Sequence, residues 1–253
     1  YNDVEVLNYA GRSSTFKNLT KKVFSSAAVC ISVSRFLADG VNRLVVKKEF
    51  TIIPNVVDTD LFYYKERTAT PFRFIHVSNM VPLKNAEGIL RAFKLLLEQG
   101  HAAELHMVGD TQPAIRKYAA DIGLTETAVY FYGEISYTAV ATKIQETHSL
   151  IVNSNIENSP CVIGEALCCG LPVIATKVGG VPELADSNNA ILIEPGNDAA
   201  LAASMQQLMK TYQQYDTKKI AENARGKFSY PVIGKQFDAV YSALITGPAA
   251  LSS

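Results

Sequence analysis

The chain has 253 residues, 48% of them hydrophobic, which is enough to bury a substantial core in one or two domains of roughly 100–200 residues. Lysine plus arginine and aspartate plus glutamate number 24 each, and this neutral balance argues against a protein that binds nucleic acid through its overall charge. No apolar run reaches the ~18 residues of a membrane-spanning helix, so we expect a globular protein without a membrane span.

The first part of the chain predicts only a piece of a domain. Between about Phe16 and Phe62 a helix-like stretch, an apolar strand, the segment 35–44 and another strand follow one another. Two strands are too few for an independent sheet. The charged, proline-bearing stretch 63–71 is typical of a linker. We therefore assign residues 1–65 to the remnant of an N-terminal domain and its linker.

From residue 72 onward, strand-like and helix-like runs alternate. Strands are expected at 72–77, 104–108, 129–132, 149–152, 173–176 and 190–193, and helices at 86–99, 114–122, 137–146, 160–169 and 199–211. Strands that are apolar throughout and alternate with helices predict a parallel sheet covered by helices on both faces. The fold class is thus Rossmann-like α/β over residues 66–226. An amphipathic helix is expected at about 230–245, within a C-terminal segment 227–253.

Ligands of such sheets bind beyond the carboxyl ends of the strands. Glycines and polar residues gather at these ends, and their turns are expected to meet along one edge of the sheet. The residues concerned are Ser78 to Lys84, Gly109 and Asp110, Gly133 to Ile135, Asn153 to Glu157, and Gly179 with Gly180. The two last glycines would let the backbone approach a ligand closely.

The most informative run joins the fourth strand to the next helix. Ser159 is a good N-cap and Pro160 suits the first helical position, so the amides of Cys161 and Val162 are expected to be unpaired. A helix N-terminus of this kind binds phosphate.

Two carboxylates flank this predicted phosphate site. Glu157 lies in the loop before the cap, and Glu165 follows Cys161 by one turn on the same helical face. A phosphate with a hydroxylated group on each side would fit between them.

The same region resembles a known family. The order Glu-x7-Glu, Ala-Leu-Cys-Cys-Gly-Leu-Pro-Val-Ile-Ala-Thr and Val-Gly-Gly-Val-Pro-Glu-Leu over residues 157–184 resembles the C-terminal signature of the retaining, nucleotide-sugar-dependent glycosyltransferases of family 4 (group 1), which have the GT-B fold. Residues 74–78 with 81–85, 104–110 and 129–133 are similar to the family's first three C-domain strands and their loops. Residues 30–34 and 51–58 resemble the closing strands of its N-terminal domain, although Val56 replaces the usual glycine.

The resemblance implies a function. A GT-B enzyme moves a sugar from a nucleoside diphosphate sugar to an acceptor hydroxyl between two Rossmann-like domains, here with retention of configuration and in cell-surface polysaccharide or glycoconjugate synthesis. The chain resembles the donor-binding half, with a final helix that crosses back to the N-terminal domain, and is expected to be inactive alone. The implied partners are the nucleotide-sugar donor and a glycan or lipid-linked acceptor, with no cofactor, metal or nucleic acid.

The resemblance also implies roles for individual residues. Glu165 would hold the ribose hydroxyls, while Glu157 and Lys84 form the catalytic pair, at the anomeric centre and on the diphosphate respectively. The remaining donor-binding residues are expected to be Ser78, Asn79, Gly109, Gly133, Ile135, Asn158, Ser159, Cys161 and Val162. Gly133 and Ile135 would hold the base through backbone groups.

One departure from the family concerns phosphate binding. Where the family has Gly-Arg, this chain has Ser78-Asn79, so Lys84 acts as a point charge without the bidentate grip of arginine. Help from Arg116 or Lys177, weaker donor binding, an altered donor and loss of activity are all open.

Alternative interpretations remain at this stage. Glu157, Glu165 and Lys84 could be ordinary solvated or paired residues, and the whole could be a nucleotide-sugar epimerase of similar fold or a non-catalytic nucleotide-sugar binding module. A nicotinamide dehydrogenase is disfavoured because no Gly-x-Gly-x-x-Gly follows the first strand of the complete domain. Four cysteines without Cys-x-x-Cys spacing predict reduced, buried thiols and a cytoplasmic protein, with peripheral association at the inner face of the membrane left open.

Overall fold

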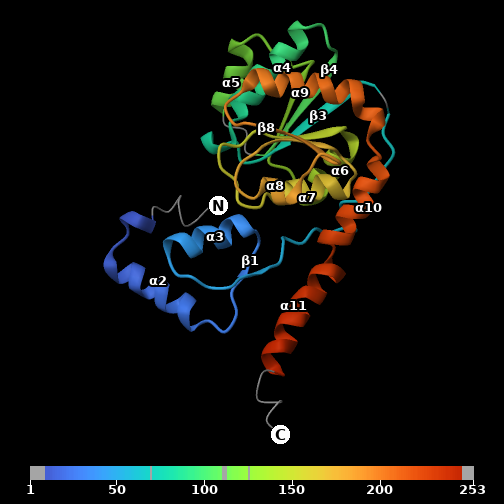
Figure 1. Ribbon diagram of the computed structural model, residues 1–253. Coiled ribbons are helices and arrows are strands. Elements are labelled where there is room, and N and C mark those ends of the chain that lie inside the picture. The colour runs from blue at the N-terminus through green and yellow to red at the C-terminus, as the bar shows by residue number, and fades with distance from the viewer. Residues whose placement is uncertain (1–8, 69, 110–112, 125, 247–253) are drawn as a thin grey trace.

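The computed structural model describes residues 9–68, 70–109, 113–124 and 126–246. It contains a small N-terminal unit and a larger α/β unit, and the last helix runs out from the larger unit (Figure 1). The small unit consists of η1 (Tyr9–Gly11), α2 (Ser14–Ser26), β1 (Ile31–Ser32), α3 (Arg35–Leu44) and β2 (Thr51–Ile52). Its two short strands pair in parallel, which agrees with the expected shortage of strands.

The larger unit is built on a six-stranded, fully parallel sheet in the order β5-β4-β3-β6-β7-β8. The strands are β3 (Phe72–Val77), β4 (Ala103–Val108), β5 (Val129–Gly133), β6 (Ser149–Val152), β7 (Val173–Thr176) and β8 (Ala190–Ile193). Four of these match the ranges expected from the sequence, and β4 and β5 each gain one residue. The order reverses between β3 and β6, where ligands of such folds bind.

Helices connect the strands and cover the sheet. They are η2 (Pro82–Lys84), α4 (Ala86–Glu98), α5 (Pro113–Asp121), α6 (Tyr137–Glu146), α7 (Cys161–Cys168), α8 (Val181–Leu184), α9 (Asp198–Thr211), η3 (Tyr212–Gln214), α10 (Thr217–Phe228) and α11 (Tyr230–Ile245). The sequence did not predict α8 or α10. Helix α8 has only 4 residues. Helix α10 buries residues at helical spacing, but Ile220 and Phe228 are the only large apolar ones among them, so its apolar content is low.

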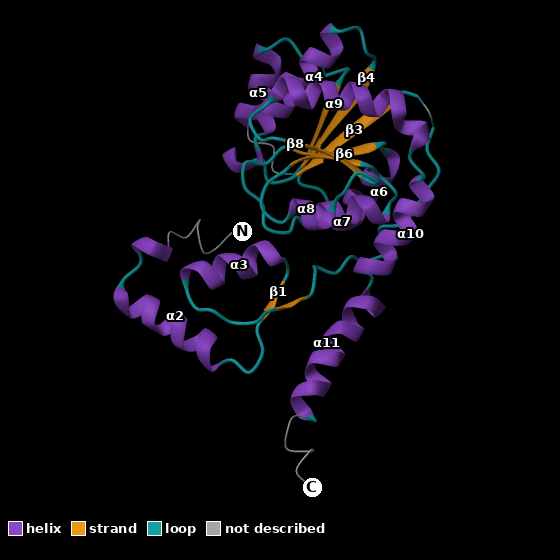
Figure 2. Ribbon diagram, in the orientation of Figure 1, coloured by secondary structure: helices purple, strands orange, loops and turns teal. Residues whose placement is uncertain are grey.

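Alternate residues of each strand enter separate cores. Leu150 and Val152 face a core with α6, α7 and α10, whereas Ile151 and Ile174 face a core with α4, α5 and α9. Figure 2 shows these helices on opposite faces of the sheet. The predicted Rossmann-like sheet with helices on both faces is therefore confirmed.

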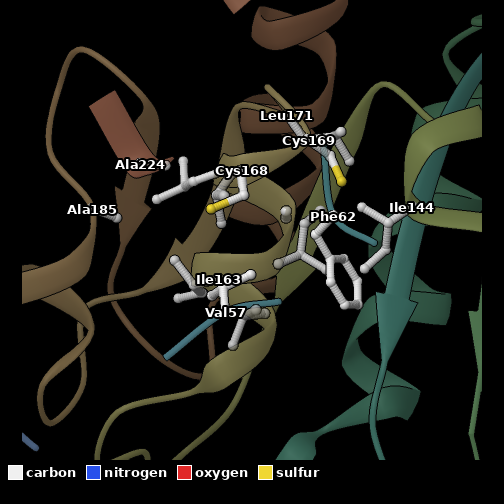
Figure 3. Packing of buried hydrophobic residues seen from close by; sticks show 14 of the residues in the cluster. Val57, Phe62, Ile144, Ile163, Cys168, Cys169, Leu171, Ala185 and Ala224 are labelled. Atoms are coloured by element: carbon white, nitrogen blue, oxygen red, sulfur yellow. The ribbon is translucent and has the colours of Figure 1, made fainter. Parts of the chain in front are cut away.

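The segment before the linker contributes to the first core. Val57 and Phe62 are fully buried there beside Ile163 (Figure 3). Burial of a phenylalanine side chain stabilises a fold by about 1.5–3 kcal/mol. The Val57 amide also donates to the Phe228 carbonyl at 2.8 Å. These contacts anchor the N-terminal unit near the end of α10 and the start of α11.

Helix α11 has the range expected from the sequence, but Ile233 is its one residue classed as buried. Among the described residues, no helix is both long and apolar enough to cross a membrane. All four cysteines are free, as expected, and Cys30, Cys168 and Cys169 are buried. Cys161 is exposed, contrary to expectation, because it opens α7 at the edge of a cavity.

Candidate functional site

The loop after β3 is anchored by a buried histidine. Nδ1 of His76 lies 2.9 Å from the Ile151 carbonyl, and Nε2 lies 2.7 Å from Oγ of Ser78. A carbonyl only accepts, so Nδ1 carries the hydrogen and the Ser78 hydroxyl donates to Nε2. Burial lowers the pKa of His76 to about 4, which keeps the ring neutral. The Ser78 hydroxyl therefore gives its proton to His76 and holds the loop, while the predicted donor-binding role of Ser78 stays a prediction.

Two residues with positive φ then turn the chain back toward the sheet. Met80 has φ 50° and Asn85 has φ 49°. Oδ1 of Asn85 accepts from the Gly88 amide at 3.3 Å and caps α4. The amide of Asn155 donates to the Leu83 carbonyl at 2.8 Å. The loop that carries Lys84 is thereby fixed to the loop that follows β6.

Lys84 and Glu157, the predicted catalytic pair, meet directly. Nζ of Lys84 lies 2.6 Å from Oε1 of Glu157, and the Ser154 hydroxyl donates to the same oxygen at 2.7 Å. Only 7% of Glu157 is exposed. Oγ1 of Thr176 donates to the Ser154 carbonyl at 2.6 Å, so β7 supports the arrangement. The charge of Lys84 is thus compensated by Glu157.

The start of α7 differs by one residue from the prediction. The N-cap is Pro160 rather than Ser159, because Pro160 has ψ 115° and the helix begins at Cys161. No side chain caps this end of the helix. The Pro160 carbonyl accepts a hydrogen bond from the Ile163 amide at 3.1 Å. The amides of Cys161 and Val162 therefore open the helix, as expected for an anion site.

A cavity of about 290 Å³ lies before this helix end. Six of the predicted site residues line it: Ser78, Asn79, Lys84, Glu157, Cys161 and Val162. The other walls are Val81, Leu83, Ile156 and Pro160, which lie in the predicted loops or at the predicted helix start, and Val77, which the sequence did not predict to lie at the site. Its size is near the lower end of the range for small-molecule sites. Helix amides, one lysine and one carboxylate share a partly apolar cavity, a combination suited to an anion joined to a hydroxylated group.

Glu165 does not line this cavity. Only 9% of it is exposed, and Oε1 accepts from the Tyr137 hydroxyl at 2.9 Å. Burial raises the pKa of Glu165, and the bond from Tyr137 lowers it. No pattern in the sequence predicted this partner, which is 28 residues away.

The residues expected to hold the base form a neighbouring strand end. The Gly109 amide donates to the Gly133 carbonyl at 2.8 Å. A Cβ on Gly109 would lie 1.8 Å from the Ser78 carbonyl oxygen, so this position requires glycine. Ile135 packs against the core. These three residues do not line the cavity, and Asp110 lies outside the described residues.

The remaining predicted contacts go to protein partners. Oδ1 of Asn158 accepts from the Ser34 hydroxyl at 2.6 Å, and the Ser159 carbonyl accepts from Nδ2 of Asn55 at 3.0 Å. Neither residue lines the cavity. Both side-chain and backbone groups of this loop are therefore used to join the two units of the chain.

Two basic residues considered for phosphate binding also lie outside the cavity. Nη2 of Arg116 donates to the Phe131 carbonyl at 3.0 Å. Lys177 is exposed after β7. Among the described residues, the basic side chain that lines the cavity is Lys84.

Gly179 and Gly180 approach protein rather than open ligand space. A Cβ on Gly179 would lie 1.6 Å from the Glu157 carbonyl oxygen, and one on Gly180 would lie 2.1 Å from that of Asn158. The expectation of a close ligand contact is thus replaced by backbone packing that supports the Glu157 loop.

Glu183, which follows these glycines, joins the two units of the chain. Its carboxylate oxygens accept from the amides of Arg35 and Phe36, each at 2.8 Å. These amides lie at the start of α3, where a carboxylate is favourable. The sequence could not assign this partner, which is 148 residues away in the chain.

Two further observations bound the site. A larger cavity of about 490 Å³ lies between α8 and α10 and contains none of the predicted site residues, so size alone does not locate the chemistry. Among the described residues, no group of three or more His, Cys, Asp or Glu side chains is placed to hold a metal ion. A metal-free reaction stays a prediction.

Known proteins with the same fold have this arrangement of elements. A sucrose-phosphate synthase from Thermosynechococcus elongatus matches 94% of this chain with a TM-score of 0.80 and 23% identity, and the chain covers 64% of it. Anabaena HepE in complex with UDP matches 94% of the chain with a TM-score of 0.79 and 22% identity, with 70% of its own length covered. These likenesses show a shared fold.

Sequence comparison reaches the same group of proteins. The N-acetyl-alpha-D-glucosaminyl L-malate synthase of Bacillus anthracis is 24% identical over 94% of this chain, which spans 65% of that relative's length. The model of the family described as glycosyl transferases group 1 matches residues 63–227. Because that match covers more than half of the chain, the protein belongs to the glycosyl transferases group 1 family.

Proposed function

We propose that this protein provides the donor site of an enzyme that transfers a sugar from a nucleoside diphosphate sugar to an acceptor hydroxyl. The observation that carries the proposal is the cavity before α7, where the amides of Cys161 and Val162 meet Lys84 and Glu157. HepE, a protein of the same fold, has been solved with UDP, which supports a nucleoside diphosphate as the ligand.

The diphosphate would bind at the start of α7. The helix dipole and the free amides favour negative charge there, and the Lys84 ammonium lies at the same cavity. To contact phosphate, Lys84 must exchange the Glu157 oxygen for a phosphate oxygen. This exchange keeps the lysine paired and releases the carboxylate for a neutral, hydroxylated partner.

The reaction then needs stabilisation of a leaving group. The bond between the anomeric carbon and the diphosphate oxygen breaks, and its electron pair stays on the diphosphate. The acceptor oxygen bonds to that carbon and gives up its proton to an oxygen of the leaving diphosphate. Lys84 and the amides of Cys161 and Val162 stabilise the growing negative charge. In many enzymes such electrostatic stabilisation is the largest single contribution to catalysis.

The two carboxylates would have separate tasks. Glu157 would contact the donor sugar near the anomeric centre, and Glu165 would accept from the ribose hydroxyls. Retention of configuration, a role in polysaccharide or glycoconjugate synthesis, and the division into residues 1–65, 66–226 and 227–253 belong to the same proposal. Gly133 and Ile135 would border the base.

A second candidate function is nucleotide-sugar binding without turnover. Asn79 is exposed at the position where the family resemblance implies arginine, and Lys84 is already paired with Glu157. A neutral amide offers a diphosphate no charge. This candidate shares the donor site but not the chemistry.

Calorimetric titration with UDP, GDP and ADP tests the shared part of both candidates. At least one of these nucleotides is expected to bind to the 253-residue chain, and absence of binding at millimolar concentration would contradict a donor site. Turnover separates the candidates when the whole protein is given donor and acceptor. A transferase releases nucleoside diphosphate in an acceptor-dependent manner, an epimerase needs no acceptor, and a binding module releases none.

A further inference from the structure

Resting on the proposed function, we infer that Tyr137 is a positioning residue for the nucleoside of the donor. Its hydroxyl holds the Glu165 carboxylate in the charged form and in the orientation needed to accept from the ribose hydroxyls. Tyr137 is not part of the sequence pattern that identifies the family, and it acts through Glu165.

The position of the Tyr137 hydroxyl is fixed from two sides. Tyr137 is the first residue of α6, which is capped by Ser136 through a bond from the Ala139 amide at 3.2 Å. Its ring packs edge-on against Phe62, with centroids 5.1 Å apart and an interplanar angle of 60°. Phe62 is fully buried. The hydroxyl that donates to Glu165 at 2.9 Å is therefore held by a helix start and by the core.

Glu165 needs such a donor because of its surroundings. The adjoining residues of α7, Ala166 and Leu167, belong to the hydrophobic core, and burial raises the pKa of the carboxyl group. A protonated carboxyl group has less capacity to accept hydrogen bonds. A donor bonded to the ionised form opposes protonation, and the Tyr137 hydroxyl supplies that bond.

Tyr137 remains a donor over the physiological pH range. Burial raises its pKa, and the charge of Glu165 raises it further. Asp58 and Tyr230 act on it in the same direction. The phenol therefore stays protonated at neutral pH and can donate to the Glu165 carboxylate.

Three thiols also lie near Glu165. Cys161 and Cys168 belong to α7 and Cys169 ends it, and each interacts electrostatically with Glu165. Burial is the main cause that raises the pKa of each thiol, so all three stay neutral near pH 7. The titration of Glu165 can thus be followed without a thiolate forming beside it.

The location of Tyr137 gives the contact a role in nucleoside binding. The residue follows Ile135 and Gly133 in the same turn, and that turn is the proposed border of the base. One side chain thus joins the base-binding turn to the proposed ribose-binding carboxylate. Since 49% of Tyr137 is exposed, loss of its hydroxyl leaves no sealed cavity.

Tyr137→Phe tests the inference because it removes the hydroxyl but keeps the aromatic ring and the packing of that ring on Phe62. The matched control is Tyr130→Phe, which removes a hydroxyl on β5 that donates to the Thr127 carbonyl at 3.0 Å. Calorimetry from pH 5 to pH 8 would use UDP and inorganic pyrophosphate as probes. Tyr137→Phe is expected to weaken UDP binding about five- to tenfold, the size of one ordinary net hydrogen bond, and to leave pyrophosphate binding unchanged. UDP binding weakens in acid as Glu165 is protonated, and this weakening should begin at a higher pH in Tyr137→Phe than in the wild type.

A second measurement reads Glu165 without any nucleotide. Carbon-13 NMR of glutamate carboxyl groups, assigned with Glu165→Gln, is expected to show a higher Glu165 pKa in Tyr137→Phe than in the wild type or in Tyr130→Phe. An unchanged pKa, or equal loss of UDP and pyrophosphate binding, would overturn the inference. If the wild type binds pyrophosphate but not UDP, the nucleoside role falls with the proposed donor. If the wild type binds UDP and Tyr137→Phe binds it equally well at every pH, the positioning role of Tyr137 is contradicted and the proposed donor site is not.

Discussion

Glu157 and Glu165 occupy two neighbouring regions of the site and are supported in different ways. Both are buried, with 7% and 9% of the residue exposed. Glu157 pairs with the ammonium of Lys84, whereas Glu165 bonds to the neutral phenol of Tyr137. A buried charge needs a partner, but the nature of the partner decides what a ligand must do. A phosphate must displace Glu157 from Lys84. A ribose can bind to Glu165 while the hydrogen bond from Tyr137 is retained.

The two regions also differ in what holds them. The Lys84 loop depends on the neutral ring of His76 through Ser78, and the Glu165 region depends on packing between Tyr137 and Phe62. The first region should therefore respond to acid and to changes of charge. The second should respond to the loss of single hydrogen bonds.

The largest expected effect is the loss of stability in acid that His76 causes. Its pKa is about 4 in the folded protein against 6.5 in a free chain, so between these pH values the unfolded chain binds more protons. The free energy of unfolding falls as pH drops from 6.5 toward 4, by about 3 kcal/mol from this residue. Denaturant titration of His76→Gln at several pH values should give a flatter profile.

His101→Gln is the control for that profile, since His101 lies outside the loop and is partly exposed. His106 and His148 also have lowered pKa values through burial, so the His76 variant should keep part of the slope. A profile identical to the wild type would show that His76 is not the buried neutral base that supports the loop.

Lys84→Ala should weaken pyrophosphate and UDP alike by about 100-fold, because a charge-assisted bond is lost and Glu157 remains unpaired. Calorimetry against Lys177→Ala measures the effect. Lys177 is exposed after β7 and should bind both probes as the wild type does. Equal losses in the two variants would remove the distinction between the cavity lysine and a general surface charge.

Glu165→Ala should weaken UDP about tenfold through loss of the ribose contact, whereas Glu157→Ala should change UDP binding less, because it frees Lys84 for phosphate. Glu194→Ala, at an exposed position, is the control for removal of a carboxylate. Titrations with UDP that gave the same loss for Glu157 and Glu165 would count against separate tasks.

The smallest expected effect is a gain. Asn79→Arg would place a bidentate donor at the cavity and should strengthen pyrophosphate binding by about three- to tenfold. Asn188→Arg adds the same charge at an exposed loop and should leave binding unchanged. If pyrophosphate titrations show no gain for Asn79→Arg, the phosphate does not lie beside residue 79.

The strands and most helices could be predicted because their apolar periodicity is local. The range 149–152 is apolar except at its first residue and matches β6. Helix α10 was missed although its buried positions recur at helical spacing, because Ile220 and Phe228 are the only large apolar residues among them. The start of α7 was misplaced by one residue because both Ser159 and Pro160 suit a helix start, and local propensity does not rank them.

The site was predicted only in part because its contacts are long-range. The pairing of Lys84 with Glu157 spans 73 positions, and that of Ser34 with Asn158 spans 124. The family resemblance identified Lys84 and Glu157 as a catalytic pair, but it implied that both contact the donor rather than each other. The packing of Gly179 on the Glu157 carbonyl shows the same point, since a glycine in a sequence predicts a close approach without naming the partner.

Amide NMR during titration with pyrophosphate and then UDP shows whether the start of α7 binds the diphosphate. We expect the largest shift changes at Cys161 and Val162 with both ligands, and additional changes around Tyr137 with UDP alone. Unchanged Cys161 and Val162 signals, with shifts instead at Lys219 and Lys227 beside the larger cavity, would contradict binding at the start of α7.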